Sequence, residues 1–359
     1  MMSFNKKWIS LSFLLFLFTI VILIACGKEG DDYPVFDEAL TLEQNVDQFI
    51  KSFVGENSPG VSILIRKDRK IILEKNFGLS DISEQQSVNS NTSFYLASVS
   101  KQFTAMSIML LQEKGLLQFS DPIHQYVQEA PAEWSEVTIH HLLTHRSGIP
   151  DYLNDLEWYR AGITNQDVLQ DLVKITDLEF EPGSKYDYSN SGYLLLSLIA
   201  SRISELRYHE FMKKYVFDTL GMTKTLVFDE SRPSIPDRAI GYDSEGGLRD
   251  YDLLTTGDGG MFSTVSDLDK WDQSFYDNSL ISEETKRLAY TDYESDGYGY
   301  GWGIRNEDGV DHYAHGGGLA GYRTLISRIP SEGFSVIILS NGSYDWVYSL
   351  RNEIVRLYL

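Results

Sequence analysis

The chain of 359 residues carries 31 Lys and Arg against 52 Asp and Glu, which gives a formal net charge of −21. Its hydrophobic content of 42% fits a globular protein and excludes a disordered tail, a collagen-like fibre and a polytopic membrane protein. An acidic chain lacks the basic field that phosphate groups require, so we expect no nucleic-acid partner. The only cysteine, Cys26, excludes a disulfide framework and a thiolate metal site.

The N-terminus has the pattern of a secretory signal. Lys6 and Lys7 precede an apolar run over residues 8–25, and Cys26 follows this run directly. The sequence Leu-Ile-Ala-Cys at this junction resembles a bacterial lipobox, in which the cysteine is lipidated and becomes the first residue of the mature protein. The alternative is an uncleaved anchor helix, for which the apolar run is at the short end of the usual length.

Both interpretations place the body of the chain outside the cytoplasmic membrane. We expect a signal peptide over residues 1–25, a polar tether over 26–37 and one domain over 38–359. The lipobox interpretation explains why the only cysteine lies where it does. We therefore expect a lipid anchor at Cys26 in the bacterial cell envelope, on the periplasmic face or the cell surface.

The first half of the domain alternates between helix and strand patterns. Residues 43–54 have apolar side chains at helical spacing, and two strand-like runs follow at 60–66 and 70–77. Residues 98–114 are apolar nearly all round and stop at Gly115. This pattern is typical of a buried helix that ends at a glycine C-cap.

The rest of the chain separates a helical middle from a C-terminal strand region. Helix patterns recur at 138–143, 166–173 and 193–203. Two more strands are predicted at 321–329 and 334–340, and an amphipathic helix ends the chain.

Strands at both ends with helices between them predict an α/β fold. We expect an antiparallel sheet built from both termini and flanked by helices, with an inserted, mostly helical subdomain over roughly 116–290. A cleft between two such lobes is the usual place for a small-molecule site.

Several common catalytic and binding motifs are missing from the sequence. It has no Gly-x-Ser-x-Gly nucleophile elbow and no phosphate-binding Gly-x-x-x-x-Gly-Lys-Ser/Thr loop. His141 and His145 are four residues apart, but Leu142 stands where a zinc protease would carry glutamate. We therefore expect structural histidines there, and neither a metal nor a cofactor.

The strongest candidate for chemistry is the segment Ser98-x-x-Lys101. On a helix these two positions share a face, so the Lys101 amine can reach the Ser98 hydroxyl. A desolvated lysine with a lowered pKa can help to remove the proton that a nucleophilic serine must lose. The same spacing also occurs by chance at Ser3 and Lys6 in the signal segment, so position and context have to support it.

Two further segments supply that context. Tyr188-x-Asn190 lies just before a helical run, where a tyrosine hydroxyl beside a lysine ammonium can act as general base and the amide can hold the lysine. The run His315-Gly-Gly-Gly comes before the strand predicted at 321–329. Its glycines let a substrate lie against the backbone, and an exposed N–H there can complete an oxyanion hole.

The three segments occur in a fixed order along the chain: Ser98-x-x-Lys101, Tyr188-x-Asn190 and His315-Gly316-Gly317. In this order they resemble the motifs of the serine β-lactamase and penicillin-binding-protein superfamily. The similarity is greatest to the class C-like serine hydrolases, which include D-Ala-D-Ala carboxypeptidases, D-aminopeptidases and esterases. The resemblance covers nearly all of the mature chain and implies a β-lactamase/transpeptidase-like fold. Segments 142–148, 260–268 and 298–303 resemble further signatures of this superfamily.

The resemblance also implies roles for individual residues. Ser98 is then the nucleophile, Lys101 its activating neighbour and Tyr188 the general base. The residues that contact the substrate are Asn190, His315, Gly316 and Gly317. The oxyanion hole is formed by the backbone N–H groups of Ser98 and Gly318.

The third motif departs from the Lys-Thr-Gly of many β-lactamases. His315 replaces the lysine that attracts a substrate carboxylate, and a histidine with an ordinary pKa of about 6.5 is largely neutral at pH 7. We therefore expect weaker carboxylate binding and inefficient hydrolysis of β-lactam antibiotics. No deacylation glutamate of the class A type is recognisable.

These observations predict a monomeric serine hydrolase that forms an acyl-enzyme on Ser98. Its substrate is expected to be a peptide of D-amino-acid type, an ester or an amide in the cell envelope. One alternative is a D,D-carboxypeptidase-like or β-lactam-binding module with little turnover, and another is a structural lipoprotein on an idle fold. The complete set of Tyr188, Asn190 and His315 favours turnover, because a sensor needs only acylation.

Overall fold

The computed structural model describes residues 33–154 and 160–358. Their main element is a six-stranded antiparallel sheet with the strand order β2-β1-β11-β10-β9-β8, which confirms the predicted fold class. Its strands are β1 (Val61–Lys67), β2 (Lys70–Phe77), β8 (Gly303–Glu307), β9 (Val310–Leu319), β10 (Tyr322–Ile329) and β11 (Phe334–Ser340). The predicted signal peptide and Cys26 lie outside the described residues.

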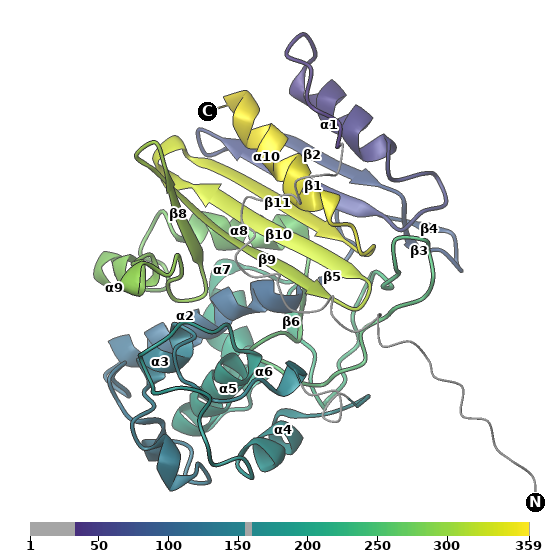
Figure 1. The fold of residues 1–359 in the computed structure, drawn as a ribbon. Helices are drawn as coiled ribbons and strands as arrows, with labels where there is room; N and C mark the ends of the chain where they lie inside the picture. The colour runs from purple at the N-terminus through teal and green to yellow at the C-terminus, as the bar shows by residue number, and fades with distance from the viewer. Residues whose placement is uncertain (1–32, 155–159, 359) are drawn as a thin grey trace, which may run out of the picture.

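Two helices from opposite ends of the chain cover one face of this sheet (Figure 1). They are α1 (Leu42–Lys51) and α10 (Trp346–Tyr358). Their apolar side chains form one core with the residues of β1, β10 and β11 that point to this face, as the alternation of side chains along a strand requires. None of the helices within the described ranges is long and apolar enough to cross a bilayer.

The other face of the sheet packs against η2 (Ala97–Val99), α2 (Ser100–Glu113) and α8 (Val265–Ser274), with the helical subdomain beyond them (Figure 1). The remaining helices are α3 (Ile139–Leu143), α4 (Asn165–Leu172), α5 (Asn190–Ser204), α6 (Tyr208–Met212), α7 (Asp218–Leu220) and α9 (Glu283–Ala289). The short strands are β3 (Leu79–Asp81), β4 (Gln86–Ser87), β5 (Phe94–Tyr95), β6 (Leu226–Val227) and β7 (Met261–Ser263). The other single-turn segments are η3 (Ile123–Gln125), η4 (Ala132–Trp134), η5 (Tyr152–Asn154), η6 (Lys213–Phe217), η7 (Tyr293–Ser295) and η8 (Pro330–Glu332).

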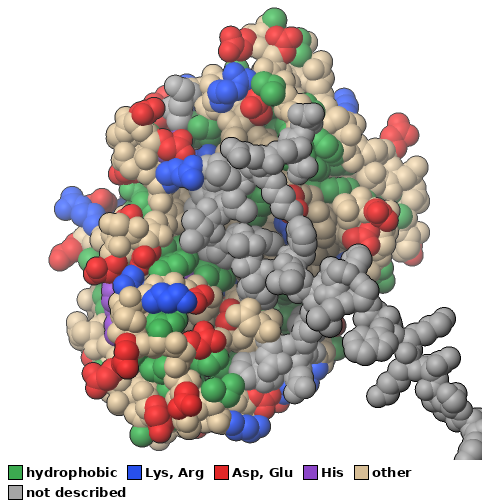
Figure 2. All heavy atoms as spheres, viewed as in Figure 1, with side chains coloured by type: hydrophobic (Ala, Val, Ile, Leu, Met, Phe, Trp, Pro, Cys, Tyr) green, Lys and Arg blue, Asp and Glu red, His purple; other side chains and the backbone are tan. Residues whose placement is uncertain are grey.

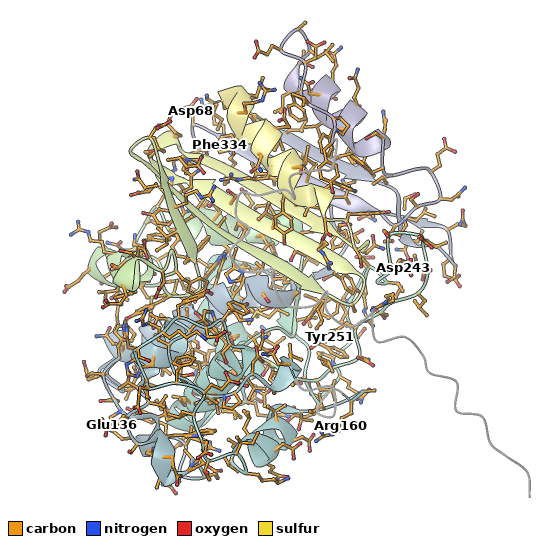
Figure 3. The ribbon with its side chains drawn as sticks, viewed as in Figure 1. Asp68, Glu136, Arg160, Asp243, Tyr251 and Phe334 are labelled. Atoms are coloured by element: carbon orange, nitrogen blue, oxygen red, sulfur yellow. The ribbon has the colours of Figure 1, made fainter. Side chains whose placement is uncertain are left out.

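Side chains fill the space between the sheet and the helical subdomain (Figure 3). Tyr251, labelled in that view, stacks on Tyr95 of β5 with ring centroids 3.9 Å apart. On the outer surface, acidic side chains are spread over both lobes of the visible face (Figure 2). This distribution agrees with the acidic composition of the chain.

The sequence pattern missed the strand that carries the third motif. The strand predicted at 321–329 is β10, and the glycine-rich third motif precedes it as expected. The motif itself, however, lies inside β9, which pairs with β10 from Tyr313 through Leu319. Consecutive glycines carry no side chains that could alternate between two faces, so they hide the strand pattern. The pairing of Gly318 with Arg323 shows that the strand continues through the motif.

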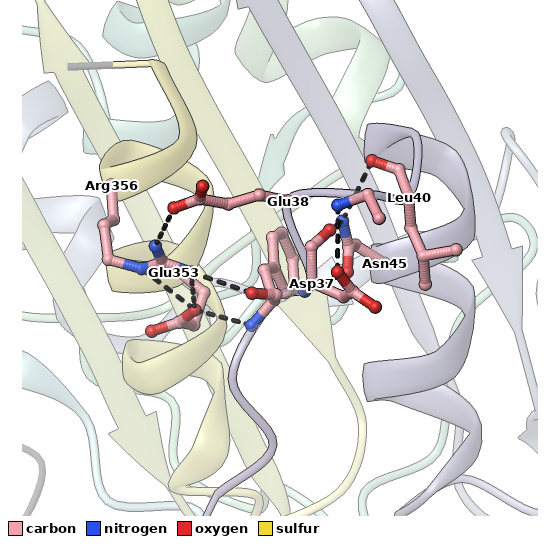
Figure 4. A network of polar contacts seen from close by, with 8 residues as sticks. Asp37, Glu38, Leu40, Asn45, Glu353 and Arg356 are labelled. Carbon is pink, nitrogen blue, oxygen red and sulfur yellow. Dashed lines mark hydrogen bonds and ion pairs between the residues drawn. The ribbon is translucent and has the colours of Figure 1, made fainter.

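The N-terminal segment is fixed to α10 and α1 before the first helix begins (Figure 4). The Phe36 N–H donates to Glu353 Oε2 at 2.7 Å, and its carbonyl accepts from Arg356 Nη2 at 3.0 Å. Asn45 of α1 accepts from the Asp37 N–H at 2.8 Å and donates to the Asp37 carbonyl at 2.9 Å. The tether predicted over 26–37 is therefore bound to the domain at its C-terminal end.

This docking predicts a stability difference between two neighbouring residues. The Phe36 side chain is 5% exposed and belongs to the core beneath α1 and α10, whereas Val35 is 72% exposed. Phe36→Ala should lower the free energy of unfolding by about 3–5 kcal/mol because it leaves a cavity. Val35→Ala should change it by less than about 0.5 kcal/mol. Urea unfolding of both variants measures the difference, and equal stabilities would contradict the docking.

Candidate active site

Ser98 lies in the η2 turn, at the junction between the two lobes. The turn packs against β9 and β10, and the Thr324 hydroxyl of β10 donates to the Leu96 carbonyl at 2.7 Å. Ala97 has a φ of +48°, which is uncommon for a residue with a side chain. Ser98 is partly exposed, while the residues on either side of it are buried. The turn thus presents the Ser98 hydroxyl at the surface of an otherwise buried segment.

Lys101 follows one helical turn later and is fully buried. Its ammonium lies 2.8 Å from Asn190 Oδ1, 2.9 Å from the Asp258 carbonyl and 3.3 Å from Ser98 Oγ. Burial lowers the pKa of Lys101 to about 8, although the charges of Asp258 and Asp151 oppose this shift. The amine is therefore easier to deprotonate than an ordinary lysine.

Asn190 is held in one orientation by a buried carboxylate. It is the first residue of α5, and its N–H and Nδ2 both donate to Asp151 Oδ2, at 3.1 Å and 2.9 Å. Because the amide nitrogen faces this acceptor, the amide oxygen must face Lys101. Asp151 thus fixes the hydrogen-bond partner of the lysine.

Tyr188 lies two residues before α5, against Lys101. The Lys101 ammonium is 4.7 Å from the centre of the Tyr188 ring, and the His145 ring is 4.2 Å away on centroids. Burial raises the pKa of Tyr188 well above its usual value, and an interaction with Ser98 opposes this effect. Its hydroxyl is buried and has no hydrogen bond of normal geometry within the described chain. Tyr188 is therefore a neutral phenol at rest, close to the serine.

His315 is a buried, neutral side chain in β9. Its Nδ1 lies 2.7 Å from the Gly316 carbonyl, which can only accept, so Nδ1 carries the proton. The opposite nitrogen, Nε2, then accepts from the Tyr298 hydroxyl at 3.0 Å. Burial and the charge of Lys101 lower the pKa of His315 to about 3. The expected neutrality of His315 at pH 7 agrees with this geometry.

The end of β9 that carries the glycines has an open edge. Within the described residues, β8 pairs with β9 only up to Ala314, whereas β10 continues to Leu319 on the other side. A Cβ atom at Gly317 would overlap the Leu96 carbonyl, so only glycine allows η2 to approach the strand this closely. The backbone of 315–319 thus lies beside the Ser98 turn, with one edge free of a neighbouring strand.

The structure brings together residues from all three motifs, but the sequence did not indicate their supporting groups. The additional residues are Asp151, Asp258 and His145, which interact with Lys101 electrostatically, and Tyr298, which donates to His315. His145 lies within the 142–148 signature, Tyr298 begins the 298–303 signature, and Asp258 lies just before the 260–268 signature. These signatures were the sequence signal from which the supporting residues could have been inferred. Their positions in the sequence do not show, however, that they lie close to Lys101. No group of three metal-binding side chains occurs in the part of the chain that the structure describes.

The arrangement has the elements of a nucleophilic active site: a serine, a buried lysine, a tyrosine and an open strand edge. The family model described as "Beta-lactamase" matches residues 46–359, and the chain therefore belongs to this family of the serine hydrolase superfamily.

Three comparisons illustrate the relationship. Penicillin-binding protein 4* of Bacillus subtilis (strain 168) is 33% identical over 317 residues, which cover 80% of this chain and 69% of the relative. The octameric penicillin-binding protein homologue from Pyrococcus abyssi superposes with a TM-score of 0.76 at 30% identity, covering 88% of this chain and 78% of the homologue. D-amino acid amidase from Ochrobactrum anthropi SV3, at 19% identity, superposes with a TM-score of 0.74 over 86% of this chain and 98% of the amidase, a likeness of fold alone.

Proposed function

We propose that the protein is a serine hydrolase that cleaves an ester, an amide or a peptide of D-amino-acid type through an acyl-enzyme on Ser98. The observation that carries this proposal is the set of acceptors around Lys101. Two of the three, Asn190 Oδ1 and the Asp258 carbonyl, cannot donate a hydrogen bond. Each of them must therefore receive an N–H from the lysine.

This requirement leaves Lys101 one neighbour with which it can exchange a proton. A neutral amine that donates to both oxygens has only its lone pair left, and the remaining neighbour is the Ser98 hydroxyl at 3.3 Å. When the amine takes the serine proton, the new N–H points back toward Ser98 and the other two hydrogen bonds remain. The lysine can therefore gain and lose this proton without rearrangement of the site.

The proposed reaction uses this exchange in two half-reactions. Ser98 Oγ forms a bond to the substrate carbonyl carbon while its proton passes to Lys101, directly or through Tyr188. The backbone N–H groups of Ser98 and Gly318 stabilise the oxyanion of the tetrahedral intermediate. The bond to the leaving group then breaks as that group takes the proton through Tyr188. In the second half-reaction water takes the place of the leaving group. It loses its proton through Tyr188 as it attacks the acyl carbon, and Ser98 Oγ then leaves and regains its proton.

The open edge of β9 supports an extended substrate. A peptide or amide backbone can pair with residues 315–319 as an added strand, while Asn190 binds the substrate amide. Since His315 is neutral, the third motif offers no cation to a substrate carboxylate. The similarity to penicillin-binding protein 4* supports a peptide or amide as the substrate class.

A substrate panel on a soluble form of residues 34–359 tests the function. We expect turnover of short-chain esters, D-amino-acid amides or D-Ala-D-Ala peptides, and little hydrolysis of a chromogenic cephalosporin. A stable adduct that releases product at no measurable rate would instead support the second candidate, a β-lactam-binding module. Cephalosporin hydrolysis faster than every other reaction in the panel would contradict the proposed substrate class.

We further propose that the enzyme is attached to the bacterial cell envelope through Cys26. The support is the lipobox-like sequence that ends the apolar run 8–25. A fatty-acid analogue fed to cells should label the wild type and not Cys26→Ala, and equal labelling of both would contradict the anchor. The Pyrococcus abyssi homologue is an octamer, so this relative does not support the monomer expected for this chain.

A further inference from the structure

The backbone of Asp258 contacts the active site, and its carboxylate is buried inside the protein. Its carbonyl accepts from Lys101 Nζ at 2.9 Å, as described above. Its side chain is buried, with 5% of the residue exposed. One carboxylate oxygen, Oδ2, accepts from the Tyr152 hydroxyl at 2.7 Å, whereas Oδ1 is buried without a hydrogen-bond partner. A buried carboxylate with one unpaired oxygen is costly unless a nearby charge stabilises it.

The groups that face this carboxylate identify the stabilising charge. From η5 it meets the Tyr152 hydroxyl, and from the residue just before η5 it meets the negative charge of Asp151. From β5 and α6 it meets Tyr95 and Tyr208, which are neutral. Lys101 on α2 is the positive group in this set, and its charge opposes the effect of burial on the pKa of Asp258. The carboxylate and the ammonium thus stabilise each other.

The groups around Lys101 lead to the same pairing. The two histidines that feel its charge, His145 and His315, are buried and have lowered pKa values, so they add no negative charge. The Tyr188 and Tyr193 rings lie 4.7 Å and 5.7 Å from the ammonium and are neutral. Only the two carboxylates, Asp258 and Asp151, act against the desolvation of the lysine.

Asp151 and Asp258 differ in how their charge is used. The Asp151 carboxylate accepts hydrogen bonds from the Asn190 N–H, from Asn190 Nδ2 and from the Leu153 N–H. These contacts make it an orienting group for the amide. Asp258 accepts one side-chain hydrogen bond and keeps one oxygen unpaired, so its main effect on the site is its charge.

We propose that Asp258 is a positioning residue whose carboxylate, held by Tyr152, stabilises the ammonium form of Lys101 and so sets the pH at which Lys101 can accept the Ser98 proton. This inference rests on the proposed function. Burial raises the pKa of Asp258 itself to about 6, so the carboxylate is charged throughout the range in which Lys101 titrates. Desolvation lowers the pKa of Lys101, and the Asp258 charge opposes this effect. Removal of the charge should therefore lower the pKa of Lys101 further.

The test is the pH dependence of Ser98 acylation by a fluorophosphonate, measured from about pH 5 to about pH 10 as a rate of adduct formation. The midpoint of the rise should lie near pH 8 in the wild type, where the pKa of Lys101 is lowered to about 8. In Asp258→Asn it should move to lower pH by about one unit or more, with the plateau rate retained within about tenfold. Asp258→Ser, a smaller neutral replacement, should move the midpoint in the same direction and serves where the asparagine variant does not fold.

Asp229→Asn is the matched control. Asp229 is 6% exposed, bonded to His209 and Ser231, and absent from the charges that act on Lys101, so its removal should leave the midpoint unchanged. An unchanged midpoint in a folded Asp258 variant, with a normal Ser98 adduct, would overturn this inference and leave the proposed function intact. A wild type that forms no adduct on Ser98 would overturn both.

Discussion

Ser98→Ala is expected to abolish the covalent adduct that the wild type forms with a fluorophosphonate or a penicillin. The physical reason is that the Ser98 hydroxyl lies 3.3 Å from Lys101 Nζ, beside the open edge of β9, and is the proposed nucleophile. Turnover of any ester or amide substrate should fall by on the order of 10⁴ to 10⁶. Intact-protein mass spectrometry measures the adduct, and a chromogenic assay measures the turnover.

The chain offers a close control in Ser100. This serine lies two residues away, is fully buried and has no hydrogen-bond partner for its hydroxyl within the described residues, so Ser100→Ala should keep the adduct. In the proposed mechanism Ser98 and Lys101 act as one unit, so the double variant Ser98→Ala plus Lys101→Ala should be barely less active than Ser98→Ala. An adduct or turnover that survives Ser98→Ala would show that the nucleophile is another residue.

Lys101→Gln is expected to lower the acylation rate by on the order of 10² to 10⁴ and to remove its pH dependence near pH 8. Burial lowers the pKa of Lys101 to about 8, and in the proposed mechanism the neutral amine accepts the serine proton. The neutral fraction grows as pH rises through this pKa. The wild-type rate should therefore increase about tenfold per pH unit below the midpoint and level off above it.

Lys286 provides the matched control for this substitution. It is also a buried lysine, with 3% of the residue exposed, and it donates to the carbonyls of Phe275 and Asp277. Lys286→Gln should leave the rate and the midpoint unchanged. A wild-type rate that falls through pH 8 would mean that the charged lysine is the active form.

The sequence pattern predicted those parts of the fold in which side chains alternate with a clear period. The helical spacing at 43–54 became α1 (Leu42–Lys51), and the runs at 70–77 and 334–340 became β2 and β11 with the same bounds. The strand β9 was missed because His315–Gly318 carries almost no side chains with which to show alternation. Its place in the sheet depends on pairing with β10, which no local pattern expresses.

The motifs indicated the central residues of the candidate site, whereas its electrostatic environment required the structure. Ser98 and Lys101 are neighbours on one helical turn, so their contact follows from spacing alone. Asp258 reaches the same lysine from a loop 157 residues further along the chain. Contacts of this kind depend on how loops cross the core, and neither composition nor periodicity records them.

The sheet order also affects how the chain is made. In the centre of the sheet β1 pairs with β11, with Val61 opposite Ser340. The first strand therefore has both of its neighbours only after the last strand has been made. During synthesis the β1–β2 hairpin leaves the ribosome before the partner of β1 on its other side has been made, and contacts between such distant segments form slowly. For the export proposed through Cys26, this order means that the six-stranded sheet cannot be complete before its last strand, β11, has been synthesised.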